Sequence, residues 1–308
     1  MRISLIATVK NEADNANNFL SSLASQSLQP FEVIITDANS SDGTLSILEG
    51  WQNKIPNLKV ISIMDCSRSA GRNIAIQNSS GEIIAAADFG CSLNTDWLRE
   101  ISEPIVSGKA DVTAGYYINT KPGVMAAVNS FFTHPALFEI DDKTFIPSTR
   151  SISFKKECWE KAGGFNEKFI LGEDTYFGVV LRKLGFKIYF NKNAVVNWDA
   201  ESSFFSMVKK LFNYSLWDSI GGFSERFYYK KMVIVSGAVS LVLFSFLNFT
   251  FFYLLLLFTG YFTAKTFIRA KKKSISLLPS LIVVLLKPVY DAVQSIGFLS
   301  GKIRRCSL

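Results

Sequence analysis

The sequence of 308 residues contains one histidine and four cysteines, and this scarcity limits the chemistry open to it. The cysteines stand at positions 66, 91, 158 and 306, so no two are close enough in sequence to suggest a zinc knuckle or a disulfide framework. A reducing cytosol is the simplest setting for such a chain. His134 precedes a proline in an aromatic stretch, and we expect it in a loop or in the core rather than in catalysis.

The chain also lacks the signatures of a nucleic-acid-binding protein, although it has 33 basic and 26 acidic residues and a net charge of +7. No basic motif interleaved with aromatic residues and no zinc-ligand spacing occurs. The basic residues gather instead at 209–231, at 265–273 and at 302–305. We therefore expect anionic lipid headgroups, and no nucleic acid, as their partners.

Charge is absent from residues 232–262, in a chain that is 48% hydrophobic. This run exceeds the roughly 20 apolar residues that cross a bilayer, so it predicts membrane attachment. A second apolar run, 275–286, is shorter than a normal span, and we expect it to cross in part or to lie at the interface.

Basic residues on both flanks of the apolar run conflict with the usual charge asymmetry of a single span. Two arrangements resolve the conflict. One is a re-entrant hairpin that bends near Asn248 with both ends cytoplasmic, and the other is a true span followed by a second crossing. In either case residues 1–230 are expected on the cytoplasmic side. If the run were not in lipid, it would have to be buried between subunits, so a homo-oligomer stays open as an alternative.

Strand-like and helix-like segments alternate over the first 90 residues. The expected strands are 3–9, 31–37, 58–64 and 82–87, and the expected helices are 14–26, 44–51 and 69–78. This rhythm predicts crossover units and a mainly parallel α/β sheet. Ligands of such sheets bind beyond the carboxyl ends of the strands, where this sequence places Glu12, Asp37 and Asp88.

Gly172, Glu173 and Asp174 open a segment of helical periodicity that ends at Gly185. The positive end of the helix dipole favours ionised carboxylates there, which suits a side chain that accepts a proton from a substrate hydroxyl. The simpler interpretation is an N-terminal cap. A strand-like stretch at 186–190 follows, and another at 195–196 ends at Trp198.

Five short segments, in this order and spacing, resemble those of family 2 glycosyltransferases. They are residues 8–12 (Thr-Val-Lys-Asn-Glu), 37–44 (Asp-Ala-Asn-Ser-Ser-Asp-Gly-Thr), 71–73 (Gly-Arg-Asn), 87–90 (Ala-Asp-Phe-Gly) and 172–174 (Gly-Glu-Asp). The resemblance implies an inverting enzyme with the GT-A fold, a Rossmann-like nucleotide-sugar-binding mixed sheet with helices on both faces. It covers residues 1–200, the expected catalytic domain, and leaves 201–231 as an amphipathic interfacial connector and 232–308 as a membrane-associated helical region.

The same resemblance implies a binding site for the nucleotide part of the donor. Its expected residues are Thr8, Val9, Glu12, Asp37, Arg72, Asp88 and Arg150. Glu12 and Asp37 would accept hydrogen bonds from the base or the ribose, and Arg72 would donate to the nucleotide. The alternative for Arg72 is a surface ion pair. Trp198 either stacks on a sugar or fills the core.

Asp88 begins the Asp-x-Asp element that in this family holds Mg²⁺ or Mn²⁺ against the diphosphate. Gly90 stands where the second Asp is expected, so the chain departs from the pattern at this position. Arg150 is expected to supply compensating positive charge.

Asp174 is expected to be the general base, and Glu173 to orient the acceptor or to tune its neighbour's charge. The donor would be a UDP- or GDP-linked sugar, and the acceptor a hydroxyl of a lipid-linked or cell-surface glycan at the inner membrane of a bacterium. Two alternatives remain open at this point. They are a polyprenyl-phosphate monosaccharide synthase and a membrane-anchored nucleotide-sugar-binding protein without catalysis.

Overall fold

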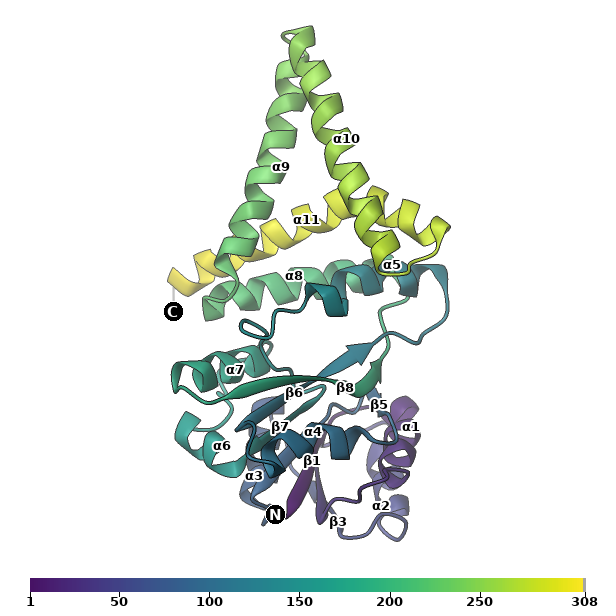
Figure 1. Ribbon diagram of the computed structural model, residues 1–308, viewed down its shortest axis with the longest axis vertical. Helices are drawn as coiled ribbons and strands as arrows, with labels where there is room; N and C mark the ends of the chain where they lie inside the picture. Colours follow the sequence, from purple (N-terminus) through teal and green to yellow (C-terminus); the bar gives the residue numbers. More distant parts are fainter. Residues whose placement is uncertain (307–308) are drawn as a thin grey trace. The chain divides into compact units, whose positions relative to one another are not determined.

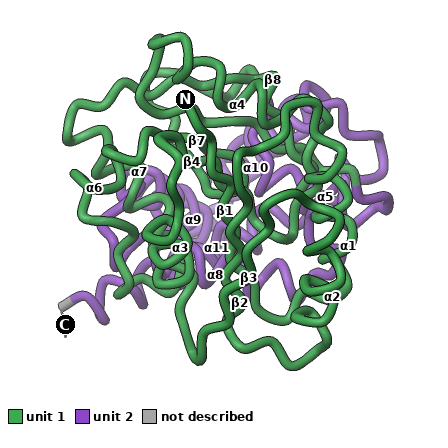
Figure 2. The backbone as a smooth tube through the Cα atoms, turned by 90° about the horizontal axis from the view of Figure 1, so that it is seen from below, with its two compact units in different colours: residues 1–120, 137–199 green, residues 121–136, 200–308 purple. Residues whose placement is uncertain are grey.

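The computed structural model describes residues 1–306, and side chains as far as residue 305. These residues form two compact units, coloured separately in Figure 2: 1–120 with 137–199, and 121–136 with the described residues from 200 onward. The short segment 121–136 thus groups with the C-terminal helices, which no sequence pattern indicated. The functional division at residues 200 and 231 stays a prediction.

The first unit is built on an eight-stranded mixed sheet with the order β3-β2-β1-β4-β7-β6-β8-β5. Its strands are β1 (Ile3–Val9), β2 (Glu32–Asp37), β3 (Leu58–Ser62), β4 (Ile83–Ala86), β5 (Cys91–Leu93), β6 (Val112–Ile118), β7 (Ile152–Lys155) and β8 (Ile188–Trp198). The pairs from β3 to β4 are parallel, as the crossover rhythm predicted. The remaining pairs are antiparallel except β6 with β8.

Helices cover both faces of this sheet (Figure 1), so the predicted fold class is confirmed. Leu5 and Ala7 of β1 point to one core and Ile6 to the other, because successive side chains of a strand alternate. The first core contains side chains of α1 (Ala13–Ala24), α2 (Thr44–Trp51) and α4 (Trp97–Val106). The second contains side chains of α3 (Arg68–Gln77), α6 (Lys156–Ala162) and α7 (Glu173–Lys183).

The predicted elements of residues 1–90 are confirmed, with ends that differ by a few residues. One expectation further along needs correction. Residues 188–190 and 195–196 belong to one strand, β8, and residues 186–187 precede it. The strand continues through Asn191 because this buried side chain donates to the carbonyl of Glu100 at 2.7 Å.

The second unit is helical. It contains α5 (Val124–Thr133), α8 (Phe204–Gly221), α9 (Glu225–Ser245), α10 (Phe249–Lys272) and α11 (Leu277–Cys306). Helices α8 and α11 pack closely because α11 presents glycines to the α8 backbone. A Cβ on Gly297 would lie 2.5 Å from the carbonyl oxygen of Phe212, and one on Gly301 would lie 2.4 Å from that of Leu216.

The uncharged run folds into α9 and α10, which converge at a tip (Figure 1). Asn248 caps α10 by accepting a hydrogen bond from the Thr250 N–H at 2.8 Å, so the predicted bend near Asn248 is confirmed. By length and composition, α9, α10 and α11 are each long and apolar enough to cross a membrane. Since α11 continues through Pro288, the second apolar run is part of a longer helix than its 12-residue pattern suggested.

Gly115 permits the curvature of the sheet where β6 and β8 shift register between Ala114 and Tyr116. A Cβ on Gly115 would lie 2.5 Å from the Ala194 carbonyl oxygen and 1.9 Å from Ser151 Oγ. That hydroxyl already accepts a hydrogen bond from Trp97 Nε1 at 2.8 Å. The carbonyl of Ala194 and the hydrogen-bonded side chain of Ser151 therefore leave no room for a Cβ at position 115.

We expect Gly115→Ala to lower the free energy of unfolding by about 1–3 kcal/mol, because overpacking forces backbone shifts. The matched control is Gly50→Ala in α2, where a Cβ would meet no atom within 4 Å and alanine favours the helix by up to about 1 kcal/mol. Denaturant unfolding of both variants, followed by tryptophan fluorescence, measures the difference. Equal stability would contradict the close approach of β6 and β8.

Candidate active site

The turns that follow β1 and β2 are tied to each other. The Asn11 N–H donates to Ser40 Oγ at 2.9 Å, and Asn11 Oδ1 accepts the Ser41 N–H at 2.8 Å. Asp42 Oδ2 accepts the N–H of Ala13 at 3.0 Å, and Asp42 also binds Thr44 in its own turn. Asp42 therefore closes its own turn and also binds the turn that follows β1.

Asp37 and Glu12 both lie at this edge, as predicted. Asp37 is fully buried at the end of β2, opposite Val9, and its carboxylate accepts the N–H and hydroxyl of Ser40 at 3.1 and 2.5 Å. Half-buried Glu12 precedes α1 and accepts from Asn15 Nδ2 at 2.7 Å.

Thr8 and Val9 occupy different environments. The Thr8 hydroxyl faces α3, where a Cβ on Gly71 would lie 2.3 Å from Thr8 Oγ1. The Val9 side chain is part of the first core, and its carbonyl accepts the Ala38 N–H at 2.9 Å. Val9 therefore offers a ligand no side-chain contact, and the nucleotide-binding role of both residues stays a prediction.

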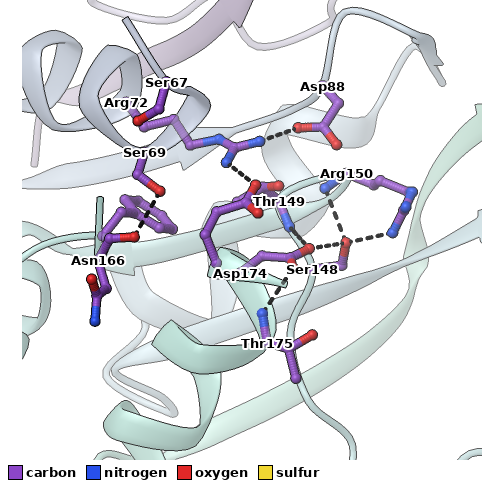
Figure 3. A network of polar contacts seen from close by, with 12 residues as sticks. Ser67, Ser69, Arg72, Asp88, Ser148, Thr149, Arg150, Asn166, Asp174 and Thr175 are labelled. Carbon is purple, nitrogen blue, oxygen red and sulfur yellow. Dashed lines mark hydrogen bonds and ion pairs between the residues drawn. The ribbon is translucent and has the colours of Figure 1, made fainter. Parts of the chain in front are cut away.

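Arg72 links two carboxylates that lie far apart in the sequence. Its guanidinium is 4% exposed, with Nη1 2.6 Å from Glu173 Oε1 and Nη2 2.9 Å from Asp88 Oδ1 (Figure 3). The side-chain amide of the neighbouring Asn73 donates to the carbonyl of Phe165 and accepts from the N–H of the same residue. The alternative of a surface ion pair is wrong, because the guanidinium of Arg72 and the carboxylate of Glu173 are both buried. A nucleotide contact by Arg72 stays a prediction.

Asp88 lies at the end of β4 among positive charges. Burial alone would raise the pKa of its carboxyl, but the charges of Arg72, Arg150 and Arg68 outweigh burial and hold the pKa below its ordinary value. Asp88 is therefore an anion at neutral pH. Its neighbour Cys91 is buried, and burial raises the pKa of that thiol far above its usual range, so it is inert at this position.

The two acidic residues at the start of α7, Glu173 and Asp174, have different partners. Glu173 turns inward to Arg72 and is buried, whereas Asp174 is half buried and turns to the 147–150 segment. Asp174 Oδ2 accepts from Ser148 Oγ at 2.8 Å and from the Thr149 N–H at 3.4 Å, and Oδ1 accepts from the Thr175 N–H at 2.8 Å (Figure 3). These bonds fix the orientation of the Asp174 carboxylate.

Arg150 lies beside this carboxylate. Its Nη1 donates to Ser148 Oγ at 2.8 Å, and its guanidinium carbon lies 3.9 Å from the centroid of the Trp198 ring. Tyr117 adds a second aromatic contact at 5.4 Å. Trp198 therefore supports a cation, a role that neither sugar stacking nor core filling had anticipated.

The carboxylate of Asp88 can offer an oxygen atom to a divalent cation. Asp88 Oδ2 makes no hydrogen bond within residues 1–306, whereas Oδ1 is taken by Arg72. No group of three or more His, Cys, Asp or Glu side chains in the described residues forms a metal site. Mg²⁺ is often held by one or two carboxylates with substrate phosphates and water, so Asp88 fits a cation shared with the donor rather than one held by protein alone.

A polar hollow of about 410 Å³ opens beside Gly90 in the first unit. Its walls include Asn15 and Asn18 of α1, Ser92 of β5, and Asn197 with Asp199 at the end of β8. A Cβ on Gly90 would meet nothing within 4 Å, so the missing second carboxylate is not excluded by sterics.

The structure thus brings Arg72, Asp88 and Glu173 into direct contact, and places Asp174 and Arg150 on opposite sides of one hydroxyl, that of Ser148. The sequence interpretation had assigned no role to Ser148. A single sequence does not distinguish this serine from any other. Only the fold shows that its hydroxyl binds both the carboxylate of Asp174 and the guanidinium of Arg150.

Comparison with known proteins identifies the class as a sugar transferase with the GT-A fold. The chain matches the family described as Glycosyl transferase family 2 over residues 4–162, more than half of its length, and it belongs to that family. It is 28% identical over 215 residues to glycosyltransferase AglE of Haloferax volcanii, a match covering 68% of this chain and 70% of the relative.

A second relative is named dolichyl N-acetyl-alpha-D-glucosaminyl phosphate 3-beta-D-2,3-diacetamido-2,3-dideoxy-beta-D-glucuronosyltransferase, from Methanococcus voltae. The chain is 22% identical to it over 240 residues, covering 69% of this chain and 71% of the relative. A shorter match, 33% identical over 116 residues, covers 36% of this chain and 20% of the poly(ribitol-phosphate) beta-N-acetylglucosaminyltransferase TarS of Staphylococcus aureus.

Solved structures share the fold. The mannosyltransferase PcManGT of Pyrobaculum calidifontis, in complex with GDP-Man and Mn²⁺, has a TM-score of 0.60 at 14% identity, covering 99% of this chain and 87% of that one. The structure of residues 1–349 of TarS in complex with UDP has a TM-score of 0.52 at 20% identity. The match covers 100% of this chain and 91% of that one. The protein is a glycosyltransferase of this family with the GT-A fold, as predicted.

The buried Arg72 should be required for folding of the first unit. Arg72→Met leaves two anions without their cation, and we expect a loss of about 3–5 kcal/mol in the free energy of unfolding. Replacing Glu173 by Leu in the same chain should restore part of it, since the uncompensated buried charge is then gone.

Denaturant unfolding of the single and double variants measures this coupling. Lys161→Met is the matched control, because it breaks an exposed pair with Glu157 and should cost less than about 1 kcal/mol. If Arg72→Met and Lys161→Met were equally stable, the bridging role of Arg72 would be wrong.

Proposed function

We propose that the protein is an inverting glycosyltransferase whose acceptor is a hydroxyl of a lipid-linked or cell-surface glycan. The observation that carries the proposal is the fixed carboxylate of Asp174, held by Ser148 and Thr149 at the start of α7. It belongs to the same side of the first unit as Asp88, to which it is connected through Glu173 and Arg72. A carboxyl group of fixed orientation thus lies near the expected donor site.

In this reaction the acceptor oxygen attacks the anomeric carbon of the donor sugar as its proton passes to Asp174. The bond from that carbon to the diphosphate oxygen breaks, and the electron pair leaves with the nucleoside diphosphate. Attack from the face opposite the leaving group inverts the configuration. Glu173, buried against Arg72, keeps that guanidinium in place and is proposed as a positioning residue.

Several residues would bind the donor. Glu12 and Asp37 supply carboxylates for the nucleoside, and Arg150 supplies positive charge on the side of Asp174. Asp88 would hold a divalent cation together with diphosphate oxygens, and the bound cation would neutralise charge on the leaving group. The GDP-Man and Mn²⁺ of PcManGT support this proposal.

Attachment to the cytoplasmic side of the inner membrane is part of the proposal. It is supported by the apolar helices α9, α10 and α11 and by a relative whose name includes a dolichyl phosphate. A lipid-linked acceptor would be reached at that surface.

The first test of the mechanism is Asp174→Asn, which keeps the size of the side chain but removes its basicity. We expect turnover to fall by about 10²–10⁴ while the dissociation constant for the nucleoside diphosphate is nearly unchanged. Transfer from radiolabelled UDP- and GDP-sugars to membrane extracts measures turnover, and calorimetry measures binding. Asp96→Asn, at an exposed pair with Arg99, is the control and should leave both values as they are.

The second test concerns the cation. Nucleoside diphosphate should bind more tightly with Mg²⁺ or Mn²⁺ than in chelator, and Asp88→Ala should abolish this difference. The Gly90→Asp variant should enlarge the difference in affinity between cation and chelator, because a Cβ at position 90 would meet no atom within 4 Å. Equal binding of the unmodified protein with cation and with chelator would instead mean that arginines alone neutralise the diphosphate.

A further inference from the structure

The hairpin formed by α9 and α10 pairs five backbone N–H groups at its tip. The N–H groups of Phe246, Leu247 and Asn248 donate to carbonyls of the last turn of α9, at 3.4, 2.9 and 3.1 Å. The Thr250 N–H donates to Asn248 Oδ1 and the Phe251 N–H to the Asn248 carbonyl. A turn exposed to water has no need of such pairing, whereas one in hydrocarbon requires it.

Three hydroxyl groups along the two helices are also paired within their own helix. Ser236, Ser245 and Thr259 donate to carbonyls three or four residues earlier in their own helices, at 3.1, 2.6 and 2.8 Å. These polar side chains therefore present no unpaired donor to their surroundings.

The tip carries large apolar side chains and no charge. Phe246, Leu247 and Phe249 are 83%, 79% and 72% exposed. Were the tip in water on the far side of a membrane, each of these side chains would forfeit about 1.5–3 kcal/mol. Far-side turns of spanning hairpins need polar residues, and this one has Asn248, which is used as the cap of α10.

The uncharged part of each leg is shorter than the hydrocarbon core. At 1.5 Å per residue, residues 232–245 of α9 extend about 21 Å and residues 249–264 of α10 about 24 Å, and any tilt reduces their depth. The core of a typical bilayer is about 30 Å thick. Counted with their charged ends, α9 and α10 are each long enough to cross. If those charged ends stay among the headgroups of one leaflet, the uncharged parts alone pass the midplane and end before the opposite headgroups.

The other ends of both legs are basic. Arg226, Lys230 and Lys231 lie at the start of α9, and Lys265, Arg269 and 271–273 lie at the end of α10. Lys231 is tied to α11 by an ion pair with Asp291 at 2.9 Å, and Lys287 also contacts Asp291. One carboxylate thus meets two ammonium groups, which leaves an excess of positive charge where the legs meet α11.

We propose that the α9–α10 hairpin enters an anionic bilayer from one side and does not emerge on the other. Its basic ends remain among the acidic headgroups of the leaflet that it enters, and its tip lies in the hydrocarbon. This goes beyond the membrane attachment proposed above and rests on it. Of the two arrangements compatible with basic flanks, it selects the re-entrant hairpin over two complete crossings.

Cysteine labelling in sealed membrane vesicles tests this directly. The full-length protein would carry Cys66→Ser and Cys306→Ser, because Cys91 and Cys158 are buried at 3% and 0% exposure. Single cysteines then replace exposed residues at the tip (Leu247→Cys) and at the two ends (Arg226→Cys and Lys272→Cys). A membrane-impermeant maleimide is added to inside-out and to right-side-out vesicles.

We expect both end positions to react only in inside-out vesicles, and the tip to react in neither preparation until detergent is added. Reaction of the tip in right-side-out vesicles would overturn the inference in favour of two crossings. Reaction of the two ends from opposite sides would overturn it in favour of a single span. A protein recovered wholly in the soluble fraction would instead refute membrane attachment itself, so the two failures are distinct.

A lengthened hairpin provides the matched control. Seven added leucines in each leg extend the tip by about 10 Å, enough to reach the far headgroups. Leu247→Cys should then become reactive in right-side-out vesicles. If the lengthened tip stayed unreactive, length would not be what keeps the natural tip inside, and the inference would be wrong.

Discussion

The contact of Arg72 with Asp88 and Glu173 is the constraint on which the catalytic unit depends. It joins α3, the end of β4 and the start of α7, so one guanidinium sets the positions of three elements. An isolated buried cation would be very costly, and two anions offset that cost. Because Glu173 is committed to Arg72, its neighbour Asp174 is left to face Ser148 and the open side of the site. The division of labour within one acidic pair follows from this bridge.

The sequence predicted the elements of residues 1–90 and the start of α7. Periodicity located the strands and helices of residues 1–90, because alternate burial on a two-faced sheet leaves a pattern that one chain displays. The edge that gathers Glu12, Asp37 and Asp88 followed from the topology of parallel strands. The continuity of β8 did not, since Asn191 looks polar in sequence and its partner is an unrelated carbonyl 91 residues away.

Partnerships between distant side chains were the part that sequence could not supply. Nothing in the segment around Arg72 indicates that it would be buried between two acids, and nothing around Trp198 indicates that it would support Arg150. Both depend on tertiary distances between segments more than 15 residues apart. In the second unit, by contrast, the bend at Asn248 was foreseeable, because an Asn that can cap a helix interrupts an otherwise uniform apolar run.

The interlocked turns after β1 and β2 have a thermodynamic consequence for donor binding. Asn11, Ser40 and Asp42 hold both turns to each other before any ligand arrives. Ordering loops around a ligand ordinarily consumes part of the gross binding energy, at about 0.5–1.5 kcal/mol for each side chain immobilised. A nucleotide meeting this preorganised edge would bind with little loss of conformational entropy, so a large share of its contact energy would remain available as affinity.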